Sequence, residues 1–375
     1  MAFEVQCTNC HQPYPEVGAP YCCPRCGGIF DFTEIWHINP QTQSLEDRGM
    51  WRYKPALGLT EAAPIVTLGE GNTPLIWTTY EQTGNKSIKV GLKCEFLNPT
   101  GSFKDRGSAL IVSFLLSRGI GDLMEDSSGN AGASLAAYAA RAGVRAHIFI
   151  PESASGPKQT QIEAYGAELI RIPGSRSDVS HAVKESADRI QPGNHEAYAS
   201  HAYLPFNIPG YASIAYELFE QMAGVPGTVL APVGQGGLIL GIARGFLALQ
   251  KAGLISHLPV LVGVQARACA PIWALTTYGV AGFSLVMEGE TIAEGIRVRY
   301  PLRGDPVIRT VEESGGFFVA VDDENIHIAQ RDLANKGVYV EPTSAVVWAA
   351  LPQILERTSP PYIGILTGSG YKFRE

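Results

Sequence analysis

The chain has 375 residues, of which 45% are hydrophobic and 17% charged, and its formal net charge is −7. This length supports two domains and a small additional module. The composition is that of an ordinary soluble globular protein. An acidic charge balance disfavours a broad nucleic-acid-binding surface, so we expect no nucleic-acid partner.

The first residues of the chain contain no positively charged region followed by an apolar run, so we expect no secretory signal. The longest apolar candidate for a membrane span, residues 229–249, contains several glycines, a proline and an arginine. Such a segment is better explained as a strand, a loop and a helix. We therefore expect a cytoplasmic protein with no membrane partner.

The N-terminal segment is rich in cysteine and contains two C-x-x-C pairs separated by twelve residues. Two such pairs can place four thiolates at tetrahedral zinc distance, and a reducing compartment favours a metal over disulfides. We expect residues 1–32 to form a zinc ribbon whose structural Zn²⁺ is held by Cys7, Cys10, Cys23 and Cys26. Cys22 is expected to stand outside the site or to replace Cys23. A vestigial ribbon without metal is the alternative.

Beyond residue 70, short β-branched or apolar runs alternate with longer amphipathic runs. Strands are predicted at 146–150, 169–172, 228–233, 260–264, 317–321 and 362–366. Helices are predicted at 105–118, 131–142, 157–165, 178–190, 208–223, 238–252 and 342–355. This alternation predicts doubly wound α/β domains with parallel sheets, in which ligands bind beyond the carboxyl ends of the strands.

Residues 98–107, Asn-Pro-Thr-Gly-Ser-Phe-Lys-Asp-Arg-Gly, place Lys104 at the mouth of a predicted helix, just after a tight turn. A lysine that lies near backbone N–H groups and partly out of water can lose its proton and form a Schiff base. The alternative is a solvated surface lysine at a helix start.

Two glycine-containing turns also open predicted helices. Residues 127–132, Ser-Ser-Gly-Asn-Ala-Gly, follow the strand-like residues 123–125 and can turn backbone amides toward an anion such as a carboxylate. Residues 234–238, Gly-Gln-Gly-Gly-Leu, have the pattern of a phosphate cradle but neither the Walker nor the Rossmann spacing. Each segment taken alone could be a plain turn.

Residues 366–370, Leu-Thr-Gly-Ser-Gly, end the last predicted strand. Taken in order from residue 98 to residue 370, the four segments resemble the pyridoxal 5'-phosphate (PLP) enzymes of the tryptophan synthase β fold, fold type II. The Lys104 segment and the cysteine-rich start are similar to the threonine synthase branch of that family. Residues 341–345, Glu-Pro-Thr-Ser-Ala, agree with this resemblance.

This resemblance implies a specific domain organisation. Residues 33–95 and 215–375 would form a large PLP-binding α/β domain, and residues 96–214 a small α/β domain that carries Lys104 and the asparagine loop. Relatives of this kind are commonly dimers, so a homodimer is expected.

The resemblance also implies roles for individual residues. Lys104 would hold PLP as a Schiff base and, once released, would remove the α-proton of an amino-acid substrate. Asn130 would bond the 3'-oxygen of the cofactor and Thr367 its pyridine nitrogen, a neutral pairing that suits elimination and replacement. The cofactor phosphate would be held by Gly234, Gln235, Gly236, Gly237 and Leu238. The substrate carboxylate would be held by Ser128, Gly129, Asn130, Ala131 and Gly132.

The implied activity is that of a carbon–oxygen lyase of threonine biosynthesis, which converts O-phospho-L-homoserine and water to L-threonine and phosphate. The chain departs from the family at two places that bear on the substrate phosphate. Ala131 and Gly132 stand where the family usually has threonine and serine, and Asn207 stands where it has an arginine. Asparagine offers a phosphate dianion no charge-assisted partner. The candidates to compensate are His201, Lys158 and Arg176, of which Arg176 is best explained as a surface residue.

Residues 291–296, Thr-Ile-Ala-Glu-Gly-Ile, instead resemble a segment of dehydratases and serine racemase. A serine/threonine dehydratase, or a β-replacement enzyme similar to cysteate synthase, is therefore the alternative within the same cofactor class. A more remote alternative is a non-enzymatic zinc-ribbon binding protein built on an inactive enzyme scaffold.

Overall fold

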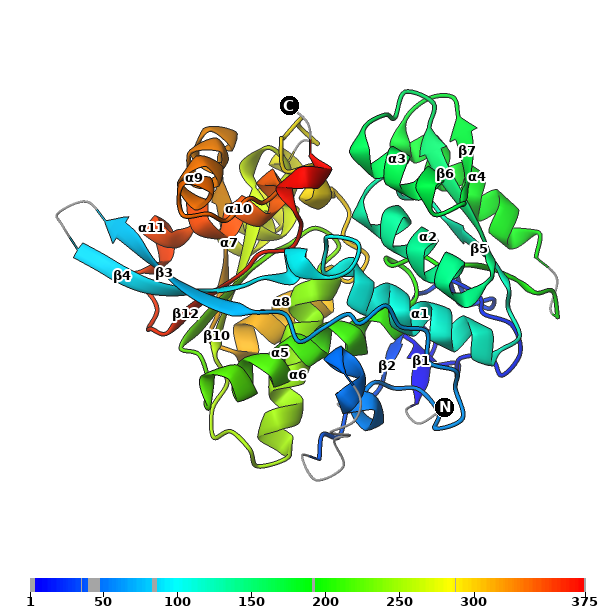
Figure 1. The fold of residues 1–375 in the computed structure, drawn as a ribbon, viewed down its shortest axis with the longest axis horizontal. Helices are drawn as coiled ribbons and strands as arrows, with labels where there is room; N and C mark the ends of the chain where they lie inside the picture. The colour runs from blue at the N-terminus through cyan, green and yellow to red at the C-terminus, as the bar shows by residue number, and fades with distance from the viewer. Residues whose placement is uncertain are drawn as a thin grey trace. The chain divides into compact units, whose positions relative to one another are not determined.

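The computed structural model describes residues 4–34, 36–39, 48–82, 86–190, 193–286 and 288–373. The chain divides into two compact units (Figure 1). The first unit comprises Met1–Glu70, Asn98–Gly210 and Phe373–Glu375, and the second comprises Gly71–Leu97 and Tyr211–Lys372. Each unit contains one sheet that is wholly or mostly parallel, with four strands in the first and six in the second. The predicted α/β class with two such sheets is confirmed.

The cysteine-rich segment forms a small antiparallel pair, β1 (Val5–Cys7) and β2 (Phe30–Phe32), within the first unit. Its aromatic side chains pack on those of the same unit. The ring of Tyr14 lies 4.6 Å from that of Phe30 and 5.1 Å from that of Phe206, measured between ring centroids. Phe206 in turn stacks on Phe114 of helix α1 (Lys104–Ser117) at 3.6 Å. The module is thus fixed to the helix that begins at Lys104.

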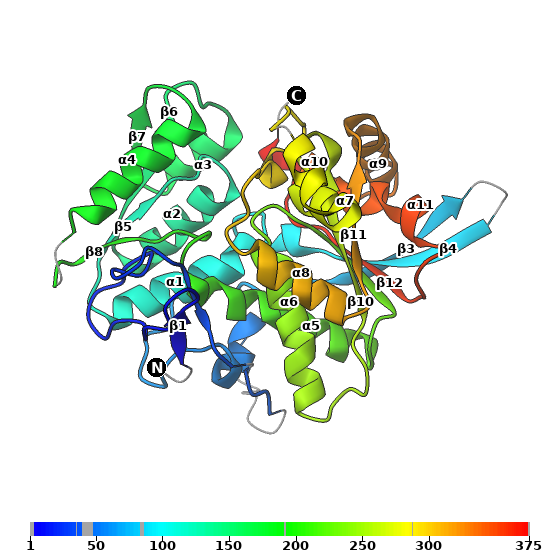
Figure 2. The same cartoon turned by 180° about the vertical axis from the view of Figure 1, so that it is seen from behind.

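The sheet of the first unit has the order β7-β6-β5-β8, and all its neighbouring strands are parallel. Helices α2 and α3 pack on one face of it and α4 on the other, as right-handed crossovers require (Figures 1 and 2). The strands are β5 (Asp122–Glu125), β6 (Arg145–Pro151), β7 (Glu168–Ile172) and β8 (Glu196–Tyr198). The helices are α2 (Asn130–Ala142), α3 (Pro157–Ala164) and α4 (Arg176–Asp188).

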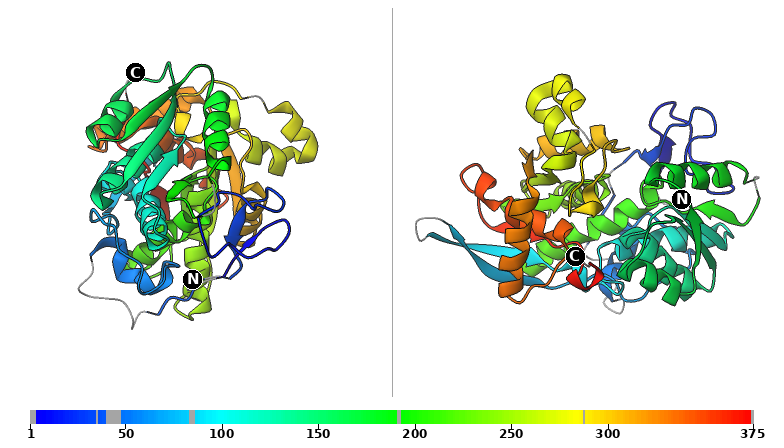
Figure 3. Two further views of the ribbon diagram at one scale, coloured as in Figure 1. Left: turned by 90° about the vertical axis from the view of Figure 1, so that its right-hand side faces the viewer. Right: turned by 90° about the horizontal axis from the view of Figure 1, so that it is seen from above.

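The sheet of the second unit has the order β11-β10-β9-β12-β4-β3, and only β3 is antiparallel to its neighbour. The β3–β4 hairpin extends from one edge of this sheet (Figure 3). The strands are β3 (Leu75–Gln82), β4 (Lys86–Lys93), β9 (Thr228–Pro232), β10 (Val260–Ala266), β11 (Phe317–Val321) and β12 (Tyr362–Ile365).

Helices cover both faces of this second sheet, with α9 and α10 on one face and α6 and α8 on the other (Figure 1). The helices are α5 (Ile208–Met222), α6 (Gly237–Lys251), α7 (Pro271–Leu285), α8 (Gly304–Glu313), α9 (Asp323–Asn335), α10 (Pro342–Ala349) and α11 (Leu351–Ile354).

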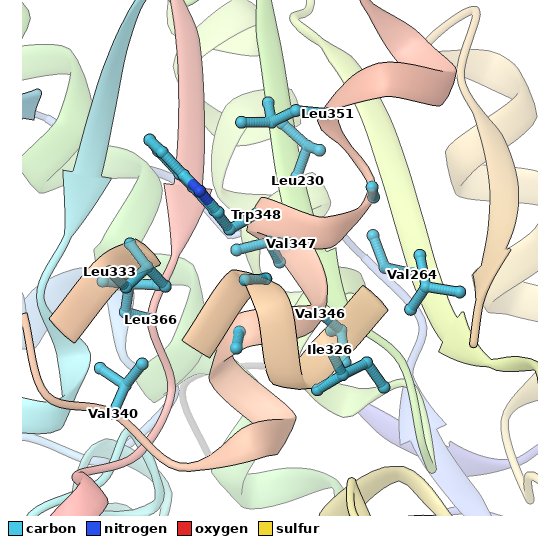
Figure 4. Close-up of a cluster of buried hydrophobic side chains, with 14 of the residues drawn as sticks. Leu230, Val264, Ile326, Leu333, Val340, Val346, Val347, Trp348, Leu351 and Leu366 are labelled. Atoms are coloured by element: carbon cyan, nitrogen blue, oxygen red, sulfur yellow. The ribbon is translucent and has the colours of Figure 1, made fainter. Parts of the chain in front are cut away.

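The main apolar core of the second unit lies between its sheet and helices α9 and α10 (Figure 4). Leu230 of β9 and Val264 of β10 pack in one cluster with Val346 and Val347 of α10. Trp348 joins the same cluster, and its indole Nε1 donates to Asp332 of α9 at 2.7 Å. This packing fixes α10, so the start of that helix has a defined position at the carboxyl end of β12.

The predicted strands and helices are confirmed to within two residues at each end, with one exception. The helix predicted at 342–355 is wrong as a single element, because α10 ends at Ala349 and a short helix, α11, follows. Pro352 lies in the first turn of α11 and has no N–H to continue the hydrogen bonds of α10. No helix in the described part of the chain is long and apolar enough to cross a membrane.

Helix α9 provides a matched test of the packing of this core. The side chain of Ile326 is fully buried in the cluster, whereas that of Ile328 on the same helix is 57% exposed. Ile326→Ala should lower the free energy of unfolding by about 2–5 kcal/mol, because it removes buried methyl groups and leaves a cavity. Ile328→Ala should change it by less than about 0.5 kcal/mol. Equal losses for the two variants in urea unfolding would contradict the packing described.

Candidate active site

A buried carboxylate network holds the turn that precedes Lys104. Lys104 is the first residue of α1, and the turn before it passes through Gly101 at a φ of 86°. The carboxylate of Asp105 accepts the Thr100 N–H at 2.7 Å, the Thr100 hydroxyl at 2.5 Å and the Ser134 hydroxyl at 2.6 Å. Because Ser134 belongs to α2, this network ties the start of α1 to the second helix of the site.

The partly buried Lys104 side chain has a pKa lowered from 10.5 to about 8. Loss of hydration is the main cause, and the positive charge of Arg176 adds to it, while the carboxyl group of Glu125 acts in the opposite direction. A lower pKa leaves more neutral amine near neutral pH, and only the neutral amine can attack a carbonyl carbon.

Glu125 is the last residue of β5, and its side chain is 2% exposed. Its carboxyl group accepts the N–H of Asp126 at 3.1 Å and that of His201 at 3.3 Å. Its pKa is raised to about 8, chiefly by burial and also by the charge and a side-chain hydrogen bond of Asp126, while Lys104 opposes the shift. Glu125 was not among the site residues predicted from the sequence, although two acidic residues stand directly before a glycine-containing loop there.

Arg176 begins α4 and lies close to this group of side chains. Its Nη1 donates to the backbone carbonyl of Asp126 at 3.4 Å, and its charge acts on Lys104. The carboxylate of Asp126 accepts instead the hydroxyl of Tyr198 at 2.7 Å. Among the residues that the structure describes, Arg176 forms no ion pair with a carboxylate. Its guanidinium group is therefore a cation near Lys104 that can take an anionic partner.

The loop from Ser127 to Gly132 closes tightly on itself at the start of α2. The N–H of Gly129 donates to the hydroxyl of Ser127 at 3.2 Å, and α2 begins at Asn130 without a side-chain cap. A Cβ atom at Gly132 would lie 2.0 Å from the carbonyl oxygen of Ser127. A glycine at position 132 is thus required by the closure of this loop.

The same loop is supported by α3. Gln159 Nε2 donates to the carbonyl oxygen of Ser128 at 2.7 Å. Lys158 precedes Gln159 in the first turn of α3 and is partly buried. The first turn of this helix therefore lies against the loop that holds Ser128, Gly129, Asn130, Ala131 and Gly132.

His201 and Asn207 are both committed to contacts within the first unit. His201 Nε2 lies 2.9 Å from the hydroxyl of Ser108. Burial, assisted by the charge of Lys104, holds the pKa of His201 well below its ordinary value, so this side chain is neutral near pH 7. Asn207 Nδ2 donates to the carbonyl oxygen of His201 at 2.6 Å. Asn207 is a structural hydrogen-bond donor here, and neither residue supplies a positive charge.

In the second unit, the segment from Gly234 to Leu238 connects β9 to α6. Gly236 has a φ of 86°, and a Cβ atom there would lie 2.4 Å from the Val307 side chain. Helix α6 begins at Gly237 without a side-chain cap, so its first N–H groups can serve an anion. Gln235 contributes differently, because its Oε1 accepts the N–H of Leu302 at 3.1 Å.

Thr367 follows β12, the parallel neighbour of β9, so it stands at the same edge of the sheet as this glycine segment. Its side chain is 1% exposed, and its hydroxyl oxygen lies 3.1 Å from that of Ser344 at the start of α10. The hydroxyl of Ser344 also accepts the N–H of Gly368 at 2.7 Å. The hydroxyl of Thr367 is thereby held in a buried, polar position.

The four predicted cysteine ligands form one cluster. The Sγ atoms of Cys7, Cys10, Cys23 and Cys26 all lie within 4.8 Å of one another, and Cys22 is not among them. Gly28 allows this convergence, because a Cβ atom there would lie 2.8 Å from the Sγ of Cys7. The predicted metal-binding cluster is confirmed as a set of side chains that can hold a metal ion.

Comparison with known proteins matches residues 66–364 to the family described as "Pyridoxal-phosphate dependent enzyme". The chain is 35% identical to a threonine synthase of Methanocaldococcus jannaschii, over 98% of this chain and 92% of that protein. It is 32% identical to a threonine synthase of Methanosarcina acetivorans, over 94% and 87% of the two chains.

Among solved structures, a threonine deaminase from T.th. has a TM-score of 0.64 at 26% identity, covering 81% of this chain and 94% of that one. A fungal L-serine ammonia-lyase from Rhizomucor miehei has a TM-score of 0.66 at 22% identity, covering 79% and 93%. The second likeness concerns the fold alone.

Neighbouring cysteines provide a test of the metal-binding cluster. The purified protein should contain about one metal ion per chain, as four converging thiolates require. Cys23→Ser removes one of the four clustered sulfur atoms and should abolish the bound metal. Cys22→Ser should leave the metal content unchanged. Elemental analysis by mass spectrometry gives both values, and equal metal content in the two variants would contradict the assignment.

Proposed function

The chain belongs to the family of pyridoxal-phosphate-dependent enzymes, and we propose that it acts as a lyase of the threonine synthase type. Its proposed reaction converts O-phospho-L-homoserine and water to L-threonine and phosphate. The similarity to threonine synthases over 98% of the chain supports this choice. Since the chain is an enzyme of this family, the alternative of a non-enzymatic zinc-ribbon binding protein is set aside.

Four polar parts of PLP each have a chemically suitable group in this chain, two in the first unit and two in the second. The amine of Lys104, with its lowered pKa, suits the aldehyde carbon. The uncapped start of α6, with a left-handed glycine before it, suits a phosphate, and the buried hydroxyl of Thr367 suits a ring nitrogen. Asn130 begins α2 and would bond the 3'-oxygen of the ring. The position of Lys104 at the start of α1, behind a turn held by the buried carboxylate of Asp105, is the observation that carries the proposal.

PLP, when bound, supplies an aldehyde that bonds to the lysine and a conjugated ring that takes up the electron pair left at the substrate Cα. The side chains act around this chemistry. The backbone amides at the start of α2, together with Ser128 and Gly129, would bind the substrate carboxylate. The amine of Lys104 would accept the α-proton as general base. The Asp105 network would orient that amine through the turn before α1.

The phosphate of the substrate needs a cationic partner, and Arg176 is the candidate. Asn207 and His201 supply no charge, whereas the guanidinium of Arg176 lies near Lys104 and forms no ion pair with a carboxylate in the described ranges. Lys158, in the helix turn against the loop from Ser127 to Gly132, is a second cation on that side. An arginine gives a phosphate a charge-assisted and potentially bidentate partner.

A second candidate reaction is dehydration of serine or threonine. Asn207 donates to a backbone carbonyl where the family has an arginine, which favours a leaving group smaller than phosphate. The 26% identity to a threonine deaminase also supports dehydration as the second candidate reaction. A β-replacement reaction similar to that of cysteate synthase would use the same lysine.

We also infer that the metal held by the four cysteines is zinc. Four thiolates with no open ligand position are the donor set of a structural zinc site. The aromatic contacts from Tyr14 to Phe206 and from Phe206 to Phe114 would carry the stabilising effect to α1.

Substrate tests separate the two reactions. Purified protein supplied with PLP should release phosphate and threonine from O-phospho-L-homoserine. Keto acid from serine or threonine, without phosphate release, would favour the dehydratase. Lys104→Ala should abolish either reaction and the visible absorbance of the lysine-bound cofactor, whereas Lys89→Ala, an exposed lysine of β4, should retain both. A protein that stays colourless with added PLP would refute the proposed function.

The role of Arg176 has its own test. Arg176→Gln should raise the KM for O-phospho-L-homoserine by about tenfold, the weight of one charge-assisted hydrogen bond. Arg171→Gln is a suitable control, because that arginine lies on β7 and faces Glu163 at 3.7 Å. If steady-state kinetics give the two variants the same KM, the assignment of the phosphate to Arg176 is wrong.

A further inference from the structure

We propose that Glu125 is the proton partner of Lys104, and that its carboxyl group holds the proton which the lysine gives up when its amine becomes a nucleophile. In this step an N–H bond of the ammonium group breaks and an O–H bond forms on the carboxylate. The two opposite charges disappear, and no other atom is transferred. The inference rests on the proposed function, since it concerns the lysine of that same site.

The position of Glu125 supports this role. It ends β5 at the carboxyl edge of the parallel sheet, where ligands of such sheets bind, and its neighbour β8 leads at the same edge to His201. Its side chain is 2% exposed. In the part of the chain that the structure describes, no arginine or lysine forms an ion pair with Glu125. Glu125 accepts the N–H of His201, whose Nε2 lies 2.9 Å from the hydroxyl of Ser108, one turn after Lys104 on the same face of α1. The charges of Lys104 and Glu125 accordingly act on each other.

Other buried carboxylates of the first unit are held in a different way. Asp105 accepts two hydroxyl groups and one backbone N–H, all at 2.5–2.7 Å. Glu70 accepts the indole N–H of Trp51 at 2.5 Å and the hydroxyl of Tyr138 at 2.6 Å. Such donors stabilise the ionised form. Within the described ranges Glu125 accepts two longer backbone N–H bonds and no hydroxyl or indole donor, so burial favours its protonated form.

The charged groups around Lys104 and Glu125 favour the neutral form of both side chains. Asp126 disfavours ionisation of Glu125 by its charge and by a side-chain hydrogen bond, and His201 is neutral. Arg176 disfavours the ammonium form of Lys104. The charged forms of Lys104 and of Glu125 are therefore both disfavoured. The proton that Lys104 loses can be accepted by the carboxylate of Glu125. A protonated Glu125 also adds no negative charge beside a site that must admit an anionic substrate.

Two isosteric variants should act in opposite directions on Lys104. Glu125→Gln removes the negative charge that favours the ammonium, so the pKa of Lys104 falls. Asp126→Asn removes one of the effects that favour the protonated form of Glu125, so Glu125 ionises at lower pH and the pKa of Lys104 rises. Asp122→Asn, at the other end of β5 and paired there with His147 and Arg145, is the matched control.

The readout is the rate at which PLP added to the cofactor-free full chain gains the visible absorbance of its lysine-bound form, measured from pH 6 to pH 10, a range of about two pH units on either side of the pair. Only neutral Lys104 reacts, so the pH of half-maximal rate reports its protonation. That midpoint should fall by about one pH unit in Glu125→Gln and rise in Asp126→Asn, with no change in Asp122→Asn.

Midpoints that stay at the wild-type value, or that move in the same direction in both variants, would overturn the proposal. A wild-type chain that gains no absorbance would instead refute the proposed function, so the two failures are distinguishable. An infrared measurement keeps the test independent of cofactor binding. The wild-type protein should show a protonated-carboxyl band below the midpoint that Glu125→Gln lacks, and the presence of this band in both proteins would also overturn the proposal.

Discussion

The hydrogen bonds to the buried carboxylate of Asp105 are the constraint on which the site of the first unit depends. They join the turn at Thr100, the start of α1 and, through Ser134, helix α2. The hydroxyl oxygen of Ser134 also lies 2.7 Å from that of Ser108, which in turn lies 2.9 Å from His201 Nε2. One acceptor thus fixes the lysine, the helix that follows the asparagine loop and the segment after β8. Without the carboxylate of Asp105, these three segments, which are distant in sequence, would lose the hydrogen bonds that hold them together.

Loss of hydration is the second constraint, and it acts in opposite senses on neighbouring groups. It lowers the pKa of Lys104 and His201 and raises that of Glu125. Each shift moves the group toward its neutral form, so a crowded cluster of ionisable side chains can exist with little net charge. A fully ionised cluster would need more hydrogen-bond donors than the backbone supplies at this edge of the sheet.

The parts of this protein that the sequence predicted well are those encoded locally. The Lys104 turn, the glycine segments and the paired cysteines each lie within a few consecutive residues, and strand–helix alternation followed from short-range periodicity. The link between Lys104 and Glu125 depends instead on His201, which bonds Glu125 through its N–H and contacts Ser108 of α1 through its ring, and no local pattern encodes it. Strand β3 was missed because none of its side chains is buried, so it carries no apolar pattern. The domain boundaries and the expected homodimer stay predictions.

Gly132 shows how a sequence difference can have a structural cause. The resemblance to threonine synthases predicts a serine at this position, and the sequence by itself therefore suggested a lost phosphate ligand. The 2.0 Å approach of a Cβ atom to the Ser127 carbonyl shows that the loop closes too tightly for any side chain. The departure at this position is therefore a property of the backbone. Arg176 lies outside this loop, on α4, so recognition of the substrate side chain can change without changing the backbone amides that would bind the carboxylate.

Both units use a strand, a glycine-containing turn and an uncapped helix start, but the glycines serve different purposes. In the second unit Gly236 has a left-handed φ of 86°, and the side chain of Val307 leaves no space there for a Cβ atom. In the first unit Gly132 is required by a close backbone contact. At Gly236 the backbone angle orients the N–H groups of the helix start. At Gly132 the tight closure of the loop orients them. Each leaves the helix start open to an anion, which is the property that cofactor phosphate and substrate carboxylate both demand.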